Sequence, residues 1–194
     1  IENIVITGQG GSAIGGVIVQ NLLSKKISVP IIINKDYNIP HFVDEKTLFI
    51  VSSYSGNTEE TLSAFKKAES KNSVIFCITS GGELLQIARS KSYSHIVIPS
   101  GGQPRAMLCY SIIQMLFTIL MSFKVPISTF KDDLIDLKNN LIDQQKNIVK
   151  EASDIVEHIS NKMPFIYAFS EFEGLALRFK QQLNENSKRH ACYN

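Results

Sequence analysis

The chain has 194 residues, of which 44% are hydrophobic and 20% are charged, so it can form a folded core and is not a disordered chain. The formal net charge is +2 and no run of Lys or Arg stands out, which argues against nucleic acid as a partner. The three cysteines, Cys77, Cys109 and Cys192, show no C-x-x-C spacing, which predicts a reducing, cytoplasmic compartment and no zinc site.

Short β-branched segments alternate with longer amphipathic ones through the first half of the chain. We expect strands near 3–7, 29–33, 47–53, 73–78 and 95–98, and helices near 12–24, 57–69, 83–90 and 104–122. This alternation predicts βαβ units and a parallel sheet. The apolar run Ile31 to Ile33 is typical of a strand that is covered on both faces.

Residues 106–123 contain no charged side chain, which makes the segment a borderline candidate for a membrane span. The segment includes Ser111, Gln114, Thr118 and Ser122, and no belt of aromatic residues flanks it. We therefore expect no membrane contact and a helix that is buried on most sides, which the subunit interface of a homodimer would cover.

A long amphipathic segment follows the break at Pro126. From Asp132 to Ser160 apolar residues recur at spacings of three and four, which predicts one long helix. Thr129 and Asp132 have the spacing of a capping box at its start.

A second strand–turn–helix begins after this helix, with a strand at 165–169 and a helix from about residue 173. Its outline resembles that of the first strand, turn and helix of the chain. Since the chain begins with Ile1 rather than Met, we expect it to be trimmed from a longer protein. We expect three parts: a first domain at 1–128, a connecting helix at 129–160, and the incomplete start of a related domain at 161–194.

The segment GQGGSAIGG at residues 8–16 follows the first strand and opens the first helix. Gly8, Gly10 and Ala13 match the G-x-G-x-x-G/A pattern of dinucleotide-binding turns. The acidic residue expected at the end of the second strand is Asp36, which comes somewhat late. A nicotinamide-binding domain therefore stays open as an interpretation but is not favoured.

The loop SSYSGNT at residues 52–58 concentrates hydroxyl groups before the next expected helix. A helix N-terminus offers free backbone N–H groups and the positive end of the dipole, and added hydroxyls suit it to a single phosphate group. Asn57 and Glu60 form a plausible N-cap pair. The same residue types are also common in ordinary turns, so this loop alone leaves both interpretations open.

Two further polar loops, at 79–82 and 100–105, follow the fourth and fifth expected strands. Ligands of open α/β sheets bind at the carboxyl ends of the strands. Arg105 falls in the first turn of the expected helix, behind Pro104 at its N1 position. Because a cation there opposes the helix dipole, we expect an anionic group nearby, either a structural carboxylate or a substrate.

The strings GQGGSAIGG, SYSGNTEETL and SGGQPRAML, in this order, resemble a SIS (sugar isomerase) domain. The later string ALRFKQQLNENSKRHA is similar to the bifunctional phosphoglucose/phosphomannose isomerase family. The resemblance covers essentially the whole chain. It implies a flavodoxin-like α/β SIS domain with a five-stranded parallel sheet, followed by the start of a second SIS-like domain.

The resemblance implies an aldose–ketose isomerase that interconverts glucose 6-phosphate, and mannose 6-phosphate, with fructose 6-phosphate. It implies a catalytic base, Glu185, and a guanidinium beside the reacting carbons, Arg105. A carboxylate can carry a proton between C1 and C2, and a guanidinium stabilises the cis-enediolate. No metal, nicotinamide or flavin is required. The residues that would bind the sugar phosphate are Gly11, Ser12, Ser53, Ser55 and Thr58.

The chain departs from the family's pattern at its end. Family members carry a ring-opening histidine beyond the Asn-Glu-Asn segment, donated across the dimer, and a lysine near the C-terminus. This chain ends at Asn194, before either, so the isolated segment is expected to hold the phosphate cradle and the base without the ring-opening group. An alternative is a non-catalytic SIS module that senses a sugar phosphate, which would need neither Glu185 nor Arg105.

Overall fold

The computed structural model describes residues 1–103 and 105–194. Pro104, expected at a helix N1 position, lies outside the described residues, and so does the side chain of Thr129 with its expected capping box. The chain forms two compact units, one of residues 1–118 and 169–175 and the other of residues 119–168 and 176–194.

The first unit is built on a five-stranded parallel sheet, as the sequence predicts, with the strand order β2-β1-β3-β4-β5. The strands are β1 (Asn3–Thr7), β2 (Ile31–Asn34), β3 (Thr47–Ser53), β4 (Val74–Thr79) and β5 (Ser94–Val97). Chain progression along the sheet reverses between β1 and β3, so the loops leaving these two strands diverge and open a crevice. The strand order therefore predicts that a ligand binds at the carboxyl ends of the neighbouring strands β1 and β3.

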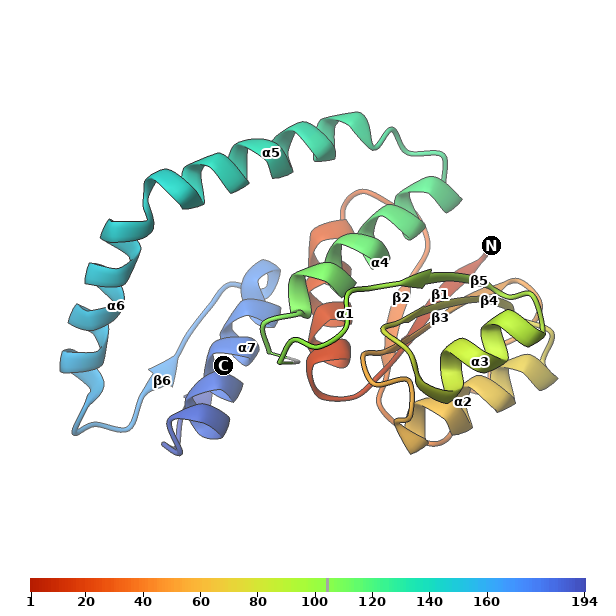
Figure 1. The fold of residues 1–194 in the computed structure, drawn as a ribbon, viewed down its shortest axis with the longest axis horizontal. Helices are drawn as coiled ribbons and strands as arrows, with labels where there is room; N and C mark the ends of the chain where they lie inside the picture. Colours follow the sequence, from red (N-terminus) through yellow and green to blue (C-terminus); the bar gives the residue numbers. More distant parts are fainter. Residues whose placement is uncertain (104) are drawn as a thin grey trace. The chain divides into compact units, whose positions relative to one another are not determined.

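Helices cover both faces of this sheet, with α1 and α4 on one side and α2 and α3 on the other (Figure 1). They are α1 (Gly10–Leu23), α2 (Glu59–Ser70), α3 (Gly82–Ser90) and α4 (Leu108–Ser122). Strand β3 is buried along its whole length. A Cβ on Gly16 of α1 would lie only 3.0 Å from Ile33 Cδ1, so glycine lets this helix approach the sheet closely.

Helix α4 begins later than the sequence predicts. Instead of starting at residue 104 it starts at Leu108, because the N–H groups of Ala106 and Met107 both donate to the carbonyl of Gln103 and close a separate turn. Arg105 therefore lies in a turn before the helix and not in its first turn.

The middle of the charge-free segment is covered on most sides, as expected, because every side chain from residue 111 to residue 120 is buried or half-buried, and exposed side chains lie only toward the ends of α4. Met115 and Ile119 are fully buried, whereas the side chain of Met121 is 65% exposed. Within the described part of the chain, no helix has the length and apolar character that crossing a membrane requires.

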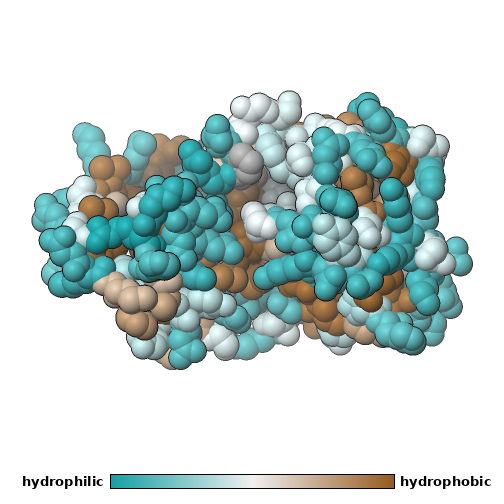
Figure 2. Space-filling view, turned by 90° about the horizontal axis from the view of Figure 1, so that it is seen from below, coloured by the Kyte–Doolittle hydropathy of each residue, from teal (hydrophilic) through white to brown (hydrophobic). Residues whose placement is uncertain are grey.

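The single long helix expected after Pro126 is two helices, α5 (Ser128–Asp143) and α6 (Gln145–Ile159). Gln144 separates them with a ψ of 2°, outside the helical region, and its N–H still bonds to Asn140 O. Large apolar side chains on both helices are exposed, among them Ile142 and Val149. On the face shown in Figure 2, hydrophilic residues predominate and apolar residues gather between them in separate patches.

The last part of the chain contains a small parallel strand pair. Its elements are β6 (Phe165–Ile166), the 3₁₀ turn η1 (Ser170–Phe172), α7 (Glu173–Asn186) and β7 (Cys192–Tyr193). Strand β6 is shorter than the expected strand at 165–169, and it pairs in parallel with β7, which follows α7 in the chain. A parallel pair connected by a helix is the βαβ unit from which parallel sheets are built.

Glu69 on α2 makes a polar contact with the segment between α3 and β5. Its Oε1 accepts hydrogen bonds from Lys91 Nζ at 2.7 Å and from the Tyr93 hydroxyl at 2.8 Å. The bond from Lys91, reinforced by Tyr93 and by the lysine charge, holds the pKa of Glu69 below its ordinary value of 4.5. Burial raises the pKa of Tyr93 to about 12, with the bond to Glu69 adding to the effect.

We expect Glu69→Gln to lower the free energy of unfolding by about 1 kcal/mol near neutral pH, because charge-assisted bonds are lost from a group that is only partly exposed. A lowered pKa in the folded state stabilises the fold above the unfolded-state pKa, and this contribution disappears as pH falls through the folded-state pKa. Urea unfolding from neutral to acid pH should show the two proteins converging in acid. A difference that persists in acid would contradict this assignment.

Candidate functional site

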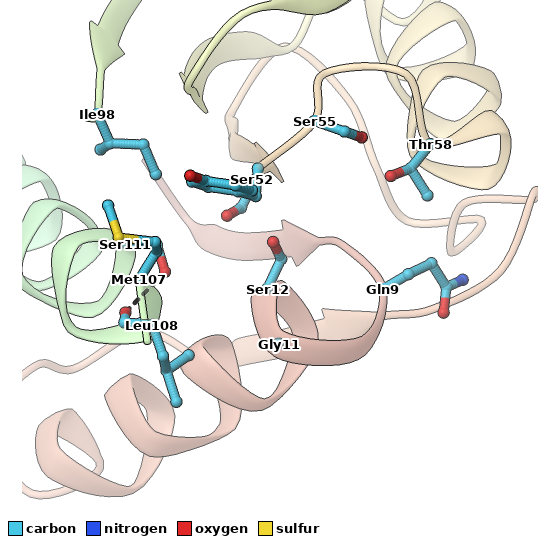
Figure 3. Close-up of a pocket in the computed structure, with 11 residues that line it drawn as sticks. Gln9, Gly11, Ser12, Ser52, Ser55, Thr58, Ile98, Met107, Leu108 and Ser111 are labelled. Carbon is cyan, nitrogen blue, oxygen red and sulfur yellow. Dashed lines mark hydrogen bonds between the residues drawn. The ribbon is translucent and has the colours of Figure 1, made fainter. Parts of the chain in front are cut away.

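A cavity of about 180 Å³ opens at the carboxyl ends of β1 and β3, where the strand order places a crevice. Figure 3 shows Ser12 at the start of α1, flanked by Met107 and by the loop with Ser55 and Thr58. The lining residues are Gln9, Gly11, Ser12, Ser52, Tyr54, Ser55, Thr58, Ile98, Met107, Leu108 and Ser111.

The loop after β1 is held against the end of β3 by a glycine contact. A Cβ on Gly8 would lie 2.8 Å from Ser52 O and 2.8 Å from Ser12 Cβ, so a larger residue would force the two loops apart. Helix α1 begins at Gly10, and its first turn contains no acidic residue. Its free N–H groups and positive dipole end therefore face the pocket without an opposing carboxylate from that turn.

The loop after β3 contributes Tyr54, Ser55 and Thr58 to the pocket lining, and Ser53 at the end of β3 supports this loop. Ser53 is only 2% exposed and does not line the cavity. Its Oγ lies 3.0 Å from Thr58 Oγ1 and accepts the N–H of Gly56 at 3.1 Å. Ser55 is exposed and its Oγ accepts the N–H of Asn57. Ser53 thus shapes the turn that presents Ser55 and Thr58.

Asn57 does not act as the expected N-cap of α2. The N-cap position belongs to Thr58, and the Asn57 Oδ1 instead accepts the N–H of Glu83, in the first turn of α3, at 2.8 Å. Glu59 and Glu60 occupy the first turn of α2. These carboxylates favour the helix but weaken its N-terminus as an anion site, so α1 offers the less opposed dipole.

Two glycines fasten this loop to the one after β4. A Cβ on Gly56, whose φ is +71°, would lie 1.9 Å from Gly81 O. A Cβ on Gly82, with φ +69°, would lie 2.3 Å from Ser55 O. Both glycines are required by backbone conformation and by close approach.

The segment leading into α4 forms another wall of the pocket. Met107, Leu108 and Ser111 line it from this side. Arg105 is exposed in the turn that precedes them, and its side chain does not belong to the described lining of the cavity.

Glu185 is exposed in the last turn of α7 and belongs to the second unit. The neighbouring Asn184 accepts the N–H of Ala191 at 2.9 Å, which ties the end of α7 to the start of β7. The first unit therefore forms the pocket by itself, and Glu185 is positioned by a different part of the chain.

The geometry does not favour the dinucleotide interpretation. The cavity is smaller than the roughly 300–1,000 Å³ typical of sites that enclose large ligands. Asp36 uses Oδ1 to accept the N–H of Asn38 at 3.1 Å, as in an ordinary Asx-turn. Gln9 donates its side-chain amide to Lys35 O. Within the described residues, His, Cys, Asp and Glu form no group of three or more that could ligate a metal ion.

Sequence patterns missed a large part of the lining. Ser52 and Tyr54 belong to the hydroxyl-rich loop itself and could have been chosen with it. Met107, Leu108 and Ser111 follow PRA in the sequence, but only the packing of α4 beside α1 brings them to the pocket. Gln9 lies within the glycine-rich turn at 8–16 and could have been chosen with it, whereas nothing in the local pattern marks Ile98.

Comparison with known proteins gives consistent results along the chain. Residues 1–125 match the SIS domain family, and residues 148–194 match the family described as the bacterial phospho-glucose isomerase C-terminal SIS domain. A bifunctional phosphoglucose/phosphomannose isomerase of Caldicellulosiruptor bescii is 42% identical over 200 residues, covering 100% of this chain and 59% of that protein. A D-glucosamine-6-phosphate 4-epimerase of Sulfolobus acidocaldarius is 34% identical over 193 residues, covering 99% of this chain and 60% of that protein.

Solved structures show the same architecture at lower sequence identity. The C-terminal domain of glucosamine-fructose-6-phosphate aminotransferase from Francisella tularensis superimposes with a TM-score of 0.75 at 21% identity, covering 100% of this chain and 58% of that one. The chain therefore spans about three fifths of the proteins that it matches.

Proposed function

This chain belongs to the SIS-domain family, and we propose that the full-length protein is an aldose–ketose isomerase that interconverts glucose 6-phosphate and mannose 6-phosphate with fructose 6-phosphate. The observation that carries the proposal is the small hydroxyl-lined cavity at the β1/β3 crevice, beside the N-terminus of α1. A single phosphate ester suits such a cavity because hydroxyls and helix N–H groups supply several donors in one place.

The proposed phosphate cradle has four lining members and one support. Gly11 and Ser12 contribute from α1, and Ser55 and Thr58 from the loop after β3. Ser53 supports the cradle from behind through Thr58 and Gly56. Holding the phosphate orients the sugar carbons, which are remote from it, toward the reacting groups.

Two further residues carry the proposed chemistry. Glu185 takes the proton α to the substrate carbonyl at one carbon and returns it at the neighbouring one, since a positioned carboxylate can act as base and then acid. Arg105 stabilises the negative charge that develops on the cis-enediolate oxygens. Glu185 carries the carbon-bound proton between C1 and C2, and the hydroxyl proton moves between the two substrate oxygens, so the isomerisation is redox-neutral overall and needs no oxidant or nicotinamide.

We extend the proposal to organisation and location. The first SIS domain would comprise residues 1–128, the connecting segment 129–160, and the start of a second SIS-like domain 161–194. The parallel β6/β7 pair and the family matches at 1–125 and 148–194 support two SIS-like parts, with the second match beginning inside the proposed connecting segment. Exposed apolar side chains on α5 and α6 support a homodimer, and three free cysteines support a cytoplasmic location.

The test is turnover. The full-length protein should convert fructose 6-phosphate to glucose 6-phosphate and mannose 6-phosphate, with light scattering on the same sample reporting a dimer. A 4-epimerisation of a hexosamine phosphate is the second candidate, because one relative carries that name. Binding of fructose 6-phosphate with no turnover would instead favour a non-catalytic sensor. NAD binding with no response to sugar phosphates would contradict the isomerase, epimerase and sensor proposals alike.

Ser12→Ala should weaken the binding of inorganic phosphate and of fructose 6-phosphate by about tenfold, because one hydroxyl bond to a charged group is lost. Stability should change by less than about 0.5 kcal/mol, since the Ser12 hydroxyl lies in the cavity wall and alanine keeps the Cβ that packs there. Calorimetric titration with phosphate measures the effect, and Ser90→Ala, on an exposed helix end, is the control. Equal affinities of wild type and Ser12→Ala would remove Ser12 from the cradle.

A further inference from the structure

Tyr54 connects the loops that follow β3, β4 and β5. Its carbonyl oxygen accepts hydrogen bonds from the N–H of Ser80 at 3.1 Å and from the Ser80 hydroxyl at 2.6 Å. Its own hydroxyl donates to Gly102 O and accepts from Gly102 N, each at 3.1 Å. The residue is therefore fixed at its backbone to one loop and at the tip of its side chain to the next.

Gly102 transmits this contact to the pocket wall. A Cβ on Gly102 would lie 2.4 Å from Met107 Sδ and 2.8 Å from its Cγ, so the thioether side chain packs directly on the glycine. Met107 lines the cavity, and its N–H bonds to Gln103 O in the turn that also contains Arg105. The position of Gly102 thus helps to set where Met107 lies in the pocket wall.

We propose that Tyr54 is a positioning residue, whose phenol holds Gly102 against the pocket so that Met107, and the turn with Arg105 that precedes it, lie in place for the bound sugar phosphate. This inference rests on the proposed function. A Phe ring at position 54 would fill the same space, but it could neither donate to Gly102 O nor accept from Gly102 N. The hydroxyl of Tyr54 therefore holds the loop with Gly102 in place, and an aromatic ring without the hydroxyl cannot do so.

Tyr54→Phe in the full-length protein should lower kcat for fructose 6-phosphate by about tenfold, because two hydrogen bonds of ordinary strength hold the loop in its productive position. Inhibition by inorganic phosphate should stay within about twofold of wild type, because the cradle residues are untouched. Tyr93→Phe is the matched control, since its hydroxyl bonds to Glu69 at the far side of α2 and should leave both values unchanged.

A double-mutant cycle tests the route through Gly102. Gly102→Ala should displace Met107 and reproduce the loss of kcat with Tyr54 intact, because the added Cβ cannot coexist with the thioether at 2.4 Å. If both changes act on the same loop, the double variant should lose little more than either single one. Fully additive losses, or wild-type kcat in Tyr54→Phe, would overturn the proposal.

Amide hydrogen exchange separates this inference from the proposed function. Residues 100–107 should exchange faster in Tyr54→Phe than in wild type or Tyr93→Phe, because a hydrogen-bonded anchor has been removed from that loop. If the wild-type protein does not isomerise sugar phosphates, the proposed function is wrong. Amide hydrogen exchange alone then tests whether Tyr54 positions the loop. Faster exchange confined to 100–107 would support the positioning role, and unchanged exchange there would overturn it.

Discussion

Replacing Glu185 with Gln in the full-length protein should lower kcat for fructose 6-phosphate by roughly 10²- to 10⁴-fold, the usual contribution of a positioned proton-transfer group. The amide keeps the size of the side chain but cannot take a proton from carbon. Because Glu185 is exposed at the end of α7, the change should leave the fold intact. Affinity for inorganic phosphate should stay within about twofold, since the loss lies in the barrier and not in binding.

The assay follows isomerisation together with loss of deuterium from C2 of labelled glucose 6-phosphate. Glu157→Gln, on the exposed surface of α6, is the matched control and should behave as wild type. A variant at Glu185 that turns over at the wild-type rate would remove this residue from the mechanism. Lost turnover with lost phosphate binding would point instead to disruption of the pocket.

Gly56→Ala should lower the free energy of unfolding by about 3 kcal/mol or more, because a left-handed φ and a backbone overlap act together. The new Cβ would lie 1.9 Å from Gly81 O, so the loops after β3 and β4 have to separate. Separation also strains the bond from Leu84 N to Gly56 O, which is 2.9 Å long. Phosphate affinity should fall in parallel, since the same turn presents Ser55.

Gly10→Ala is the control for the conformational part of this loss. Its φ is +51°, but nothing lies within 4 Å of the position of its Cβ, so it carries strain without overlap. It should cost only about 1 kcal/mol in chemical unfolding. Equal losses in the two variants would show that φ alone matters and that the contact between the two loops does not.

Local patterns predicted the sheet and the order of its elements well, because β-branched runs and amphipathic segments carry their own periodicity. The five strands occur close to their expected positions. The interruption at Gln144 could not be foreseen, since neither Pro nor Gly marks it and the apolar spacing continues across it. The late start of α4 depends on a turn closed by Gln103 O, which no sequence pattern encodes.

In the candidate site, too, some features were predicted from the sequence and others depend on tertiary packing. The family resemblance implied a cradle of Gly11, Ser12, Ser53, Ser55 and Thr58, and all of these except Ser53 line the cavity. The role of Asn57 as an acceptor for α3 arises from packing between residues 26 positions apart. The contact of Tyr54 with Gly102 likewise joins residues 48 positions apart. Such contacts depend on the tertiary fold, so composition and spacing alone could not reveal them.

The most direct test is a crystal structure of the full-length protein with fructose 6-phosphate bound. The account predicts the phosphate oxygens within hydrogen-bonding distance, about 3 Å, of the hydroxyls of Ser12, Ser55 and Thr58, with a Glu185 carboxylate beside C1 and C2. A phosphate bound away from the β1/β3 crevice, or a sugar whose reacting carbons no Glu185 approaches, would contradict it.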